Sequence, residues 1–360
     1  MSDSTDNIIV DTATRIFRDL CEPATINDAE KGVWPTALWD ALEESGLTVA
    51  WVPEELGGAG AAMADGFAVL RAAGRFAVPA PLAETLMAGW LLARAGIAAP
   101  AGPMTIAPVH ADGHITLDAD GRLAGRARRV PFARNASHIA VLAHRVGLQP
   151  PGLSREGERA VALVATDGLP IGHDASLAGE PRDTVSFDGA APVAVKPAAA
   201  NEDTIQRLGA AVRLQQIAGA LETILDQSVQ WALDRSQFGR PIAKFQAVQH
   251  NLATLAGEVA AAGAAADLAA EACAGADLGE AEIAIAKVRA GEAAGAGAAI
   301  AHQVHGAMGF TYEHTLHHAT RRLWSWREEF GNETVWATRL GRMVAAQGAD
   351  QLWPFITQGS

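Results

Sequence analysis

The sequence predicts an α+β protein with an N-terminal helical domain (residues 1–101), a middle β-barrel-like domain (102–200) and a C-terminal four-helix bundle (201–360). Two observations predict this order. In the first and last parts, apolar residues recur every three or four positions, which is the period of an amphipathic helix. In the middle part, short apolar runs are bounded by Gly, Pro, Asp and Asn, as is typical of strands joined by tight turns. With 360 residues, 49% of them apolar, the chain is long enough for several packed units.

The N-terminal part shows helical spacing on both sides of a glycine-rich segment. Leu38, Ala41 and Leu42 lie at i, i+3 and i+4, and Phe67 and Leu70 begin another apolar face. Between them stands the run VPEELGGAG at 52–60. Because glycine adopts positive φ without strain, this run predicts a tight turn between two helices.

The middle and C-terminal parts differ in their apolar pattern. The runs at 138–142 (HIAVL) and 160–164 (AVALV) predict two strands of a compact β domain. Further along, an amphipathic stripe predicts a long helix; its members are Ile242, Phe245, Val248, Leu252, Leu255 and Val259. The Ala- and Gly-rich stretch at 260–301 predicts close helix approach, either within the bundle or at a subunit interface.

Composition excludes several classes of protein. With 28 Lys and Arg against 41 Asp and Glu, the net charge of −13 gives no general basic field for nucleic acid. The two cysteines, Cys21 and Cys273, are too few for a disulfide framework and are interpreted as core thiols. Residues 1–6 are polar and acidic, unlike a secretory signal, and charges and prolines interrupt the most apolar stretch, Leu82–Ile106. We therefore expect a cytoplasmic protein that binds neither nucleic acid nor a membrane.

The run RSQFGRPI at 235–242, followed by FQAVQ at 245–249, is the most informative segment. It describes a helix end, a Gly/Pro turn and a helix start. Arg235 offers five donors to an anion at a helix C-terminus, and Phe238 offers a flat apolar face. This pairing suits a dinucleotide pyrophosphate and its adenine, although a capping Arg beside a buried Phe is the alternative.

A second segment, HQVHGAMGFTYE at 302–313, places two glycines around a turn that ends a helix. The exposed backbone N–H groups of such a turn can hold phosphate or flavin carbonyl groups. The position of this segment, a fixed distance after the first one, is a more specific pattern than its glycine spacing alone.

These segments make the chain similar to the acyl-CoA dehydrogenase family of flavoproteins. The run R-x-Q-F-G-x-P-I-x-x-F-Q-x-x-Q, the run Q-x-x-G-x-x-G-F, the run VPEELGGAG and the α–β–α order all match that family. The resemblance implies FAD as cofactor, α,β-desaturation of an acyl-CoA thioester, and a tetramer or dimer of dimers. It also implies that the first segment reaches the FAD of a neighbouring subunit.

The resemblance assigns cofactor contacts residue by residue. It implies that Arg235 and Gln237 lie near the pyrophosphate, and that Phe238 lies beside the adenine. Further implied FAD contacts, the last five of them on the adenosine side, are Phe245, Gln246, Gln303, Val304, His305, Gly306 and Ala307.

The catalytic base departs from the family pattern. Desaturation needs a carboxylate that removes the α-proton, and many members carry it as the Glu of a Tyr-Glu-Gly-Thr run. Phe330 occupies that position here, and Glu329 stands one residue early, a rotation of about 100° on a helix. The family's second location for the base, 26 residues before Arg235, is Gly209. The catalytic base is therefore unassigned, with Glu329 as a candidate.

The middle domain also departs. It has neither the family's Thr-Glu-x-x-x-Gly-Ser-Asp loop nor its Trp-Ile-Thr strand, and Pro131 stands near the usual Thr, where it cannot donate a backbone hydrogen bond. This asymmetry resembles one half of the heteromeric α2β2 acyl-CoA dehydrogenases that act on steroid side chains in bacteria. We expect a paralogous partner subunit that supplies the base, and an electron acceptor such as an electron-transfer flavoprotein. The alternatives are a self-sufficient homomeric dehydrogenase that uses Glu329 or an unrecognised carboxylate, and a non-catalytic structural subunit.

Five of the eleven histidines fall between His302 and His318. His302 and His305 have spacing that suits a metal, but of Asp, Glu and Cys only Glu313 joins them at ligand spacing. We predict no metal site and interpret these histidines as a polar lining near cofactor or acyl-CoA, or as ordinary interface residues. Nearby, Trp324 or Trp326 is a candidate to shape the acyl pocket.

Overall fold

The computed structural model describes residues 8–108, 113–146, 158–275 and 278–358. They form two compact units. The first holds the chain up to Leu20 with Asn27–Gly66 and Pro79–Gln206, and the second holds Cys21–Ile26, Phe67–Val78 and the chain from Arg207 onward. The acidic segment at 1–6 lies outside the described residues, and the division at 101 and 200 stays a prediction.

Five helices precede the strands, as the apolar spacing predicts. They are α1 (Ile8–Leu20), α2 (Pro23–Glu30), α3 (Thr36–Glu44), α4 (Met63–Arg75) and α5 (Leu82–Arg94). On α3, Leu38 and Leu42 are buried, and on α4, Phe67 and Leu70 are buried. Each pair lies on one helical face, and burying that face stabilises the helix more than its intrinsic propensity does.

The glycine-rich run between α3 and α4 forms the predicted tight turn around a short 3-10 helix, Glu54–Leu56. Gly57 and Gly60 have φ of 84° and 62°, where other residues are strained. A Cβ on Gly58 would lie 1.9 Å from the carbonyl oxygen of Val52. The turn therefore requires glycine both for conformation and for space.

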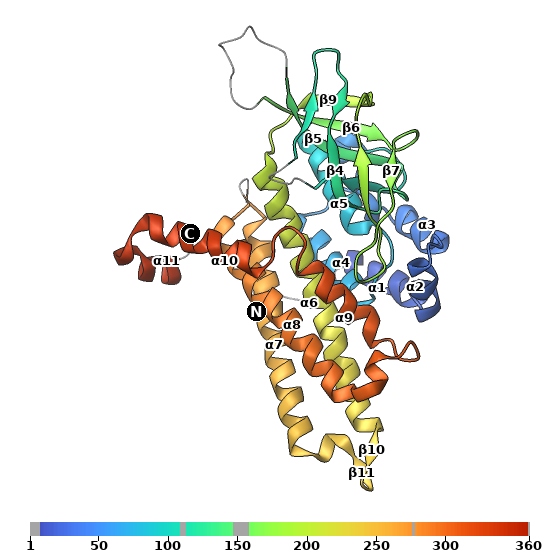
Figure 1. Cartoon of the computed structure of the whole chain (residues 1–360), viewed down its shortest axis with the longest axis vertical. Coiled ribbons are helices and arrows are strands. Elements are labelled where there is room, and N and C mark those ends of the chain that lie inside the picture. The colour runs from blue at the N-terminus through green and yellow to red at the C-terminus, as the bar shows by residue number, and fades with distance from the viewer. Residues whose placement is uncertain (1–7, 109–112, 147–157, 276–277, 359–360) are drawn as a thin grey trace. The chain divides into compact units, whose positions relative to one another are not determined.

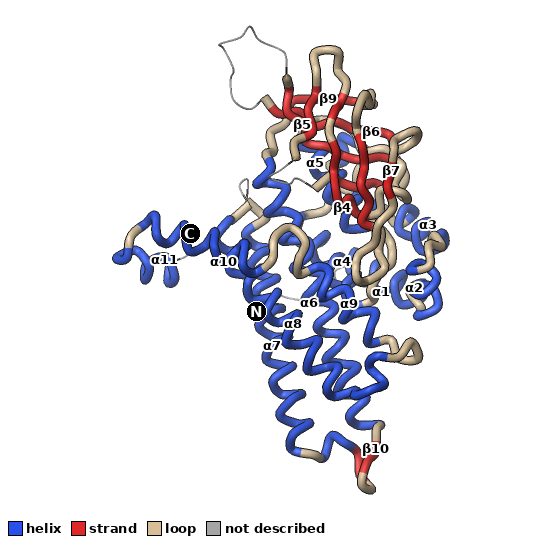
Figure 2. The backbone as a smooth tube through the Cα atoms, in the orientation of Figure 1, coloured by secondary structure: helices blue, strands red, loops and turns tan. Residues whose placement is uncertain are grey.

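The middle of the chain forms two sheets around one core (Figure 2). The larger has the order β3-β2-β5-β6-β9, with β1 also paired to β5, and the smaller has the order β4-β8-β7. The strands are β1 (Met104–Ile106), β2 (Ile115–Leu117), β3 (Leu123–Ala124), β4 (Arg126–Pro131), β5 (His138–Arg145), β6 (Arg159–Ala165), β7 (Ile171–Gly172), β8 (Arg182–Ser186) and β9 (Ala194–Pro197). β5 and β6 contain the two predicted strands and pair antiparallel. Their buried residues share the core with Val185 and Phe187 at the end of the smaller sheet, so the prediction of a compact β domain is confirmed.

The C-terminal part is helical, as predicted, and its long helices lie side by side (Figure 1). The helices are α6 (Glu202–Asp234), α7 (Gln246–Ala272), α8 (Glu280–His305), α9 (Leu316–Trp326), α10 (Glu333–Gln347) and α11 (Leu352–Gln358). Gln215 Nε2 of α6 donates to the carbonyl of Ala266 on α7 at 2.7 Å. A Cβ on Gly297 of α8 would lie 2.8 Å from the Leu221 side chain. The small residues thus permit the close packing that their clustering predicts.

Two glycines let the backbones of α4 and α6 touch. A Cβ on Gly219 would lie 1.9 Å from the carbonyl oxygen of Arg71, and a Cβ on Gly74 would lie 2.2 Å from that of Gln216. On the neighbouring surface, Arg71 bridges the two helices through its ion pair with Glu222, at 2.6 Å.

α7 is the one helix in the described part of the chain that is long and apolar enough to cross a membrane, although only 28% of its most apolar window is buried. It packs along α8, and both predicted core thiols, Cys21 and Cys273, are buried elsewhere in the same unit. Burial raises the pKa of each thiol to about 12, so both remain protonated.

Substituting Gly219→Ala should destabilise the protein by about 1–3 kcal/mol, because the new methyl group forces α4 and α6 apart. The matched control is Gly257→Ala on α7, where a Cβ meets nothing within 4 Å. That change should be neutral or stabilising by up to about 1 kcal/mol, since alanine has the higher helix propensity. Urea unfolding measures the stability of both variants. Equal unfolding midpoints for the two would contradict the close approach of α4 to α6 at Gly219.

Candidate functional site

The segment after α6 is a two-residue hairpin at the end of the bundle. β10 (Ser236–Gln237) pairs antiparallel with β11 (Arg240–Pro241), and the turn residues Phe238 and Gly239 have φ of 51° and 78°. Such a turn normally carries Asn or Gly at its first position, and a bulky residue there costs about 1–3 kcal/mol. Phe238 is 92% exposed, so burial within this chain does not compensate the strain. The arrangement excludes a buried Phe and displays the ring outward.

The polar residues of both sequence motifs are available for a ligand. Arg235, Gln237, Gln246 and Gln303 are exposed, and within the described ranges their side chains make no hydrogen bond or ion pair. Phe245 is half-buried behind the hairpin, with the Arg240 guanidinium 4.3 Å from its ring centre. The free groups therefore combine a guanidinium, three amides and an aromatic face, which is a donor set that fits a dinucleotide.

One aromatic contact brings the two motifs together. Trp231, whose carbonyl accepts the Arg235 N–H one turn further on, stacks on the ring of His305 with centroids 5.4 Å apart. His305 is the last residue of α8, and Gly306 follows with φ of 62°. The hairpin and the loop at 303–307 therefore lie at the same end of the bundle. In this loop Gln303, Gly306 and Ala307 are exposed, whereas Val304 and His305 are buried.

His305 presents a defined acceptor in this loop. Its Nδ1 lies 2.8 Å from the carbonyl oxygen of Ala301, so Nδ1 carries the proton and donates. Nε2 is buried and has no partner in the described part of the chain. Burial, together with nearby His314 and His302, lowers the pKa of His305 to about 4, and the ring is neutral. A buried acceptor without a partner suits a hydroxyl or amino group of a nucleoside.

The remaining histidines of this region form aromatic stacks. His302 lies between Phe310 and Trp324, with centroids at 4.2 and 5.6 Å, and its Nε2 is 3.0 Å from Thr320 Oγ1. Burial lowers the pKa of His302, and that of His318 to about 3. Among the described residues, these histidines do not bring three metal-ligating atoms together.

The two family positions for the catalytic base face each other. Gly209 lies on α6, and a Cβ there would lie 2.2 Å from the Phe330 ring. Phe330 follows α9 in the left-handed region, with φ of 53°. The aromatic ring thus fills the space that a side chain at position 209 would need, so Phe330 excludes a carboxylate at position 209.

A buried lysine fixes the loop that carries Phe330. Lys287 Nζ of α8 donates to the carbonyls of Arg327 and Gly331, each at 2.7 Å. Trp336 Nε1 donates to the Phe330 carbonyl at 2.9 Å. Burial lowers the pKa of Lys287 to about 8, against the raising effect of nearby glutamates. Three hydrogen bonds therefore hold the backbone on both sides of the ring.

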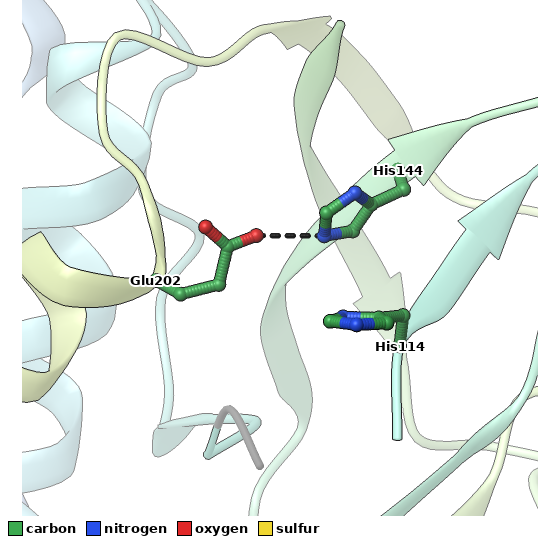
Figure 3. Close-up of side chains that lie close together, drawn as sticks. All are labelled: His114, His144 and Glu202. Atoms are coloured by element: carbon green, nitrogen blue, oxygen red, sulfur yellow. Dashed lines mark ion pairs between the residues drawn. The ribbon is translucent and has the colours of Figure 1, made fainter. Parts of the chain in front are cut away.

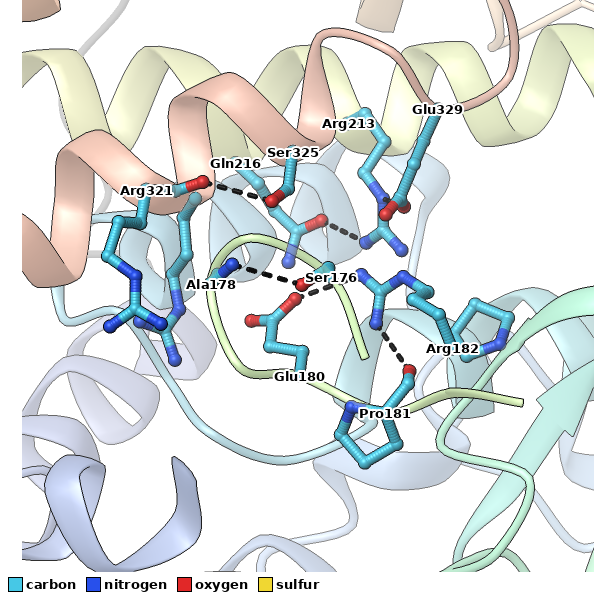
Figure 4. Close-up of polar contacts among 12 residues, drawn as sticks. Ser176, Ala178, Glu180, Pro181, Arg182, Arg213, Gln216, Arg321, Ser325 and Glu329 are labelled. Atoms are coloured by element: carbon cyan, nitrogen blue, oxygen red, sulfur yellow. Dashed lines mark hydrogen bonds and ion pairs between the residues drawn. The ribbon is translucent and has the colours of Figure 1, made fainter. Parts of the chain in front are cut away.

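Glu329, the candidate base, is buried and paired. Arg213 Nε of α6 donates to Glu329 Oε2 at 2.7 Å, and another guanidinium nitrogen donates to Gln216 Oε1 (Figure 4). Trp326, on the same turn, is buried as well, and Arg327 pairs with Glu333 at 3.0 Å. A carboxylate that accepts from a buried guanidinium is stabilised as the anion but is held in place by it.

Backbone groups of the strand expected beside the flavin ring, Pro131 and Phe132, make hydrogen bonds to other residues of the first unit. The Pro131 carbonyl accepts from Thr105 Oγ1 at 2.6 Å, and the Phe132 N–H donates to the Pro181 carbonyl at 3.1 Å. The next turn is closed by Arg134, whose backbone N–H and guanidinium both donate to buried Asp183. Each of these groups is therefore already hydrogen-bonded within the chain.

Arg213, Lys287 and Trp336 were not singled out by sequence reasoning. Arg213 and Lys287 interrupt apolar helix faces, and a buried cation needs partners. A charged residue on an apolar helix face is the feature in the sequence that could have identified Arg213 and Lys287. It does not reveal which carbonyl or carboxylate groups pair with these cations.

The α–β–α order and the two joined motifs are similar to those of flavoproteins. Family models for the acyl-CoA dehydrogenase N-terminal domain and C-terminal domain match residues 3–99 and 205–345. Acyl-CoA dehydrogenase IpdE2 of Mycobacterium tuberculosis (strain ATCC 25618 / H37Rv) is 31% identical over 282 residues, 78% of each chain. The chain belongs to the acyl-CoA dehydrogenase family, and FAD is the cofactor of this family.

Two solved structures share the fold. The chain superposes on the ChsE4-ChsE5 complex from Mycobacterium tuberculosis with a TM-score of 0.81 and 24% identity, covering 96% of this chain and 98% of that one. It superposes on the Tcur3481-Tcur3483 steroid ACAD G363A variant with a TM-score of 0.81 and 22% identity, covering 95% and 98%. The α+β expectation is therefore confirmed.

A double-mutant cycle tests the contact between the base positions. Gly209→Ala should cost about 1–3 kcal/mol by overpacking, and Phe330→Ala about 3–5 kcal/mol by leaving a cavity. Together they should cost less than the sum by at least about 1 kcal/mol, because the smaller residue relieves the clash. Urea unfolding of the four proteins gives the coupling, and strict additivity would refute the contact.

Acid should destabilise the protein between pH 6.5 and 4. The unfolded chain binds protons on histidine near the ordinary pKa of 6.5, whereas folded His305 and His318 bind them only near 4 and 3. Their contribution is complete above pH 6.5 and is lost as the pH falls. A His318→Phe variant should lose less stability than the parent between pH 7.5 and 5, and exposed His250→Phe should match the parent.

Proposed function

We propose that this chain is one subunit of a heteromeric, FAD-dependent acyl-CoA dehydrogenase that desaturates an acyl-CoA thioester between Cα and Cβ. In this proposal it completes FAD sites shared with a paralogous subunit, and that subunit supplies the carboxylate base. The carrying observation is the packing of Phe330 on Gly209, which leaves neither family position with a carboxylate.

In this proposal the chain's own residues bind FAD and orient it. Arg235 supplies guanidinium donors to the pyrophosphate, Phe238 covers the adenine, and the unpaired His305 Nε2 accepts from the adenosine side. FAD, when bound, supplies the hydride acceptor for the desaturation. Because the exposed groups point away from this chain's own core, they suit a cofactor that is shared with a neighbour.

The surface near the hairpin supports a partner. Leu233, Phe310 and Tyr312 are 53%, 69% and 78% exposed, and α7 carries an exposed face of small residues. Large exposed apolar side chains that gather on one part of a chain favour a protein interface. An obligate partner that covers this face explains the exposure without requiring a membrane.

The named relatives support a heteromer and a bulky substrate. One structural neighbour is the ChsE4-ChsE5 complex, and another is the Tcur3481-Tcur3483 steroid ACAD G363A variant. We extend to this chain an α2β2 assembly, a steroid side-chain or similarly bulky acyl-CoA as substrate, an electron-transfer flavoprotein as acceptor, and a cytoplasmic location.

The decisive experiment compares the chain alone with the chain co-expressed with an acyl-CoA dehydrogenase paralogue encoded by a neighbouring gene. We expect a colourless or unstable product alone, and one FAD per two chains in the complex, measured by flavin absorbance and light scattering. In the complex, Arg235→Ala and Phe238→Ala should lower the FAD content at least tenfold at limiting FAD, while exposed Arg15→Ala should not. A stable, yellow and active protein from this chain alone would overturn the heteromer.

The Arg213–Glu329 pair should serve stability and not proton abstraction. Replacing Glu329 alone with Gln removes the carboxylate that pairs with the buried Arg213 guanidinium and should cost about 3–5 kcal/mol. The double replacement Arg213→Met and Glu329→Met removes both charges and should restore most of that stability. If the double variant folds in the complex but loses turnover more than 100-fold, Glu329 is the base and the proposal fails.

A further inference from the structure

Three ligating side chains of the first unit converge away from the cofactor motifs. His114 directly precedes β2, His144 lies on β5, and Glu202 is the first residue of α6 (Figure 3). β2 and β5 pair in parallel, with Ile115 opposite Ala143 and Thr116 opposite His144, which brings the two imidazoles to the same place. No assignment above uses any of the three residues.

Their geometry is close to that of a metal site. One ligating atom from each residue lies within 4.8 Å of the other two, and this is the one such group found in the described part of the chain. His144 Nε2 is 2.6 Å from Glu202 Oε1, and the two imidazole centroids are 4.6 Å apart. Ligands that bind zinc at about 2.0–2.2 Å in a tetrahedron lie about 3.3 Å from one another. A small side-chain rotation brings the three atoms to that separation.

The surroundings favour a small cation. Beside the three side chains lies a cavity of about 10 Å³, also lined by Ile115 and Leu142, which is about the space of a single water molecule or ion.

A ligand set of two imidazoles and one carboxylate favours some metal ions over others. Imidazole nitrogen prefers Zn²⁺ and its first-row neighbours, whereas Mg²⁺ and Ca²⁺ prefer oxygen alone. Arg159 Nε lies 2.8 Å from Glu202, and its positive charge opposes a cation on the same carboxylate. Affinity should therefore be lower than in a structural site with four protein ligands.

We infer that His114, His144 and Glu202 form a binding site for Zn²⁺ or a similar first-row divalent ion, with one coordination position open to water. The ion replaces the hydrogen bond between His144 and Glu202 and ties the β2 and β5 edge to the first turn of α6. The site stands apart from the dehydrogenase proposal and does not depend on it.

The test titrates Zn²⁺ into the full-length chain after chelator treatment, using calorimetry and a competing indicator dye. We expect one tight equivalent per chain and a higher thermal unfolding midpoint. His114→Ala should weaken binding at least tenfold and is the deciding variant, because His114 is exposed and its loss leaves the fold intact. His144→Ala and Glu202→Gln should do the same, and exposed His250→Ala should bind like the parent.

Arg159→Gln separates a metal site from a simple ion-pair network. Removing the opposing charge should strengthen Zn²⁺ binding severalfold if Glu202 is a ligand. The site is overturned if the parent binds no stoichiometric equivalent of Zn²⁺. It is also overturned if His114→Ala and Arg159→Gln both bind Zn²⁺ with the affinity of the parent. In either case only the ion pairs among His144, Glu202 and Arg159 remain.

Discussion

The contact between Phe330 and Gly209 constrains the packing of the C-terminal helices. The ring occupies the volume above α6 where a side chain at position 209 would project. It is held there by hydrogen bonds from Lys287 and Trp336 to the flanking backbone, and by the left-handed conformation of Phe330 itself. Since packed interiors do not deform continuously, a side chain added at position 209 is relieved only by a smaller residue at position 330. The packing that closes position 209 is thus built into the loop that carries Phe330.

The charged groups near this contact form a buried ion pair, whereas the polar residues of the two sequence motifs are exposed. Arg213 and Glu329 neutralise each other in the interior, whereas Arg235 and the neighbouring glutamines remain without partners among the residues that the structure describes. The charged groups beside Phe330 are therefore paired within the chain, whereas those of the hairpin and the loop at 303–307 are open to a ligand.

Two aromatic residues of the C-terminal part have strained backbones. Phe238 and Phe330 both have positive φ, although aromatic residues rarely adopt it. The Phe238 ring is exposed, and the Phe330 ring packs against the backbone of α6 at Gly209. Where the backbones of α4 and α6 approach each other, the chain uses glycine instead.

The sequence by itself determined the order of helices and strands, the turn at 52–60 and the two cofactor motifs, because periodicity and glycine chemistry are local properties. The resemblance also drew attention to positions 330 and 209, which hold Phe and Gly. Only the tertiary structure decided that these two residues touch and that Arg213 pairs with Glu329. It likewise decided that Trp231 joins the motifs and that His114 and His144 meet Glu202. These contacts join residues far apart in the chain, and no local pattern encodes which distant side chains share a space.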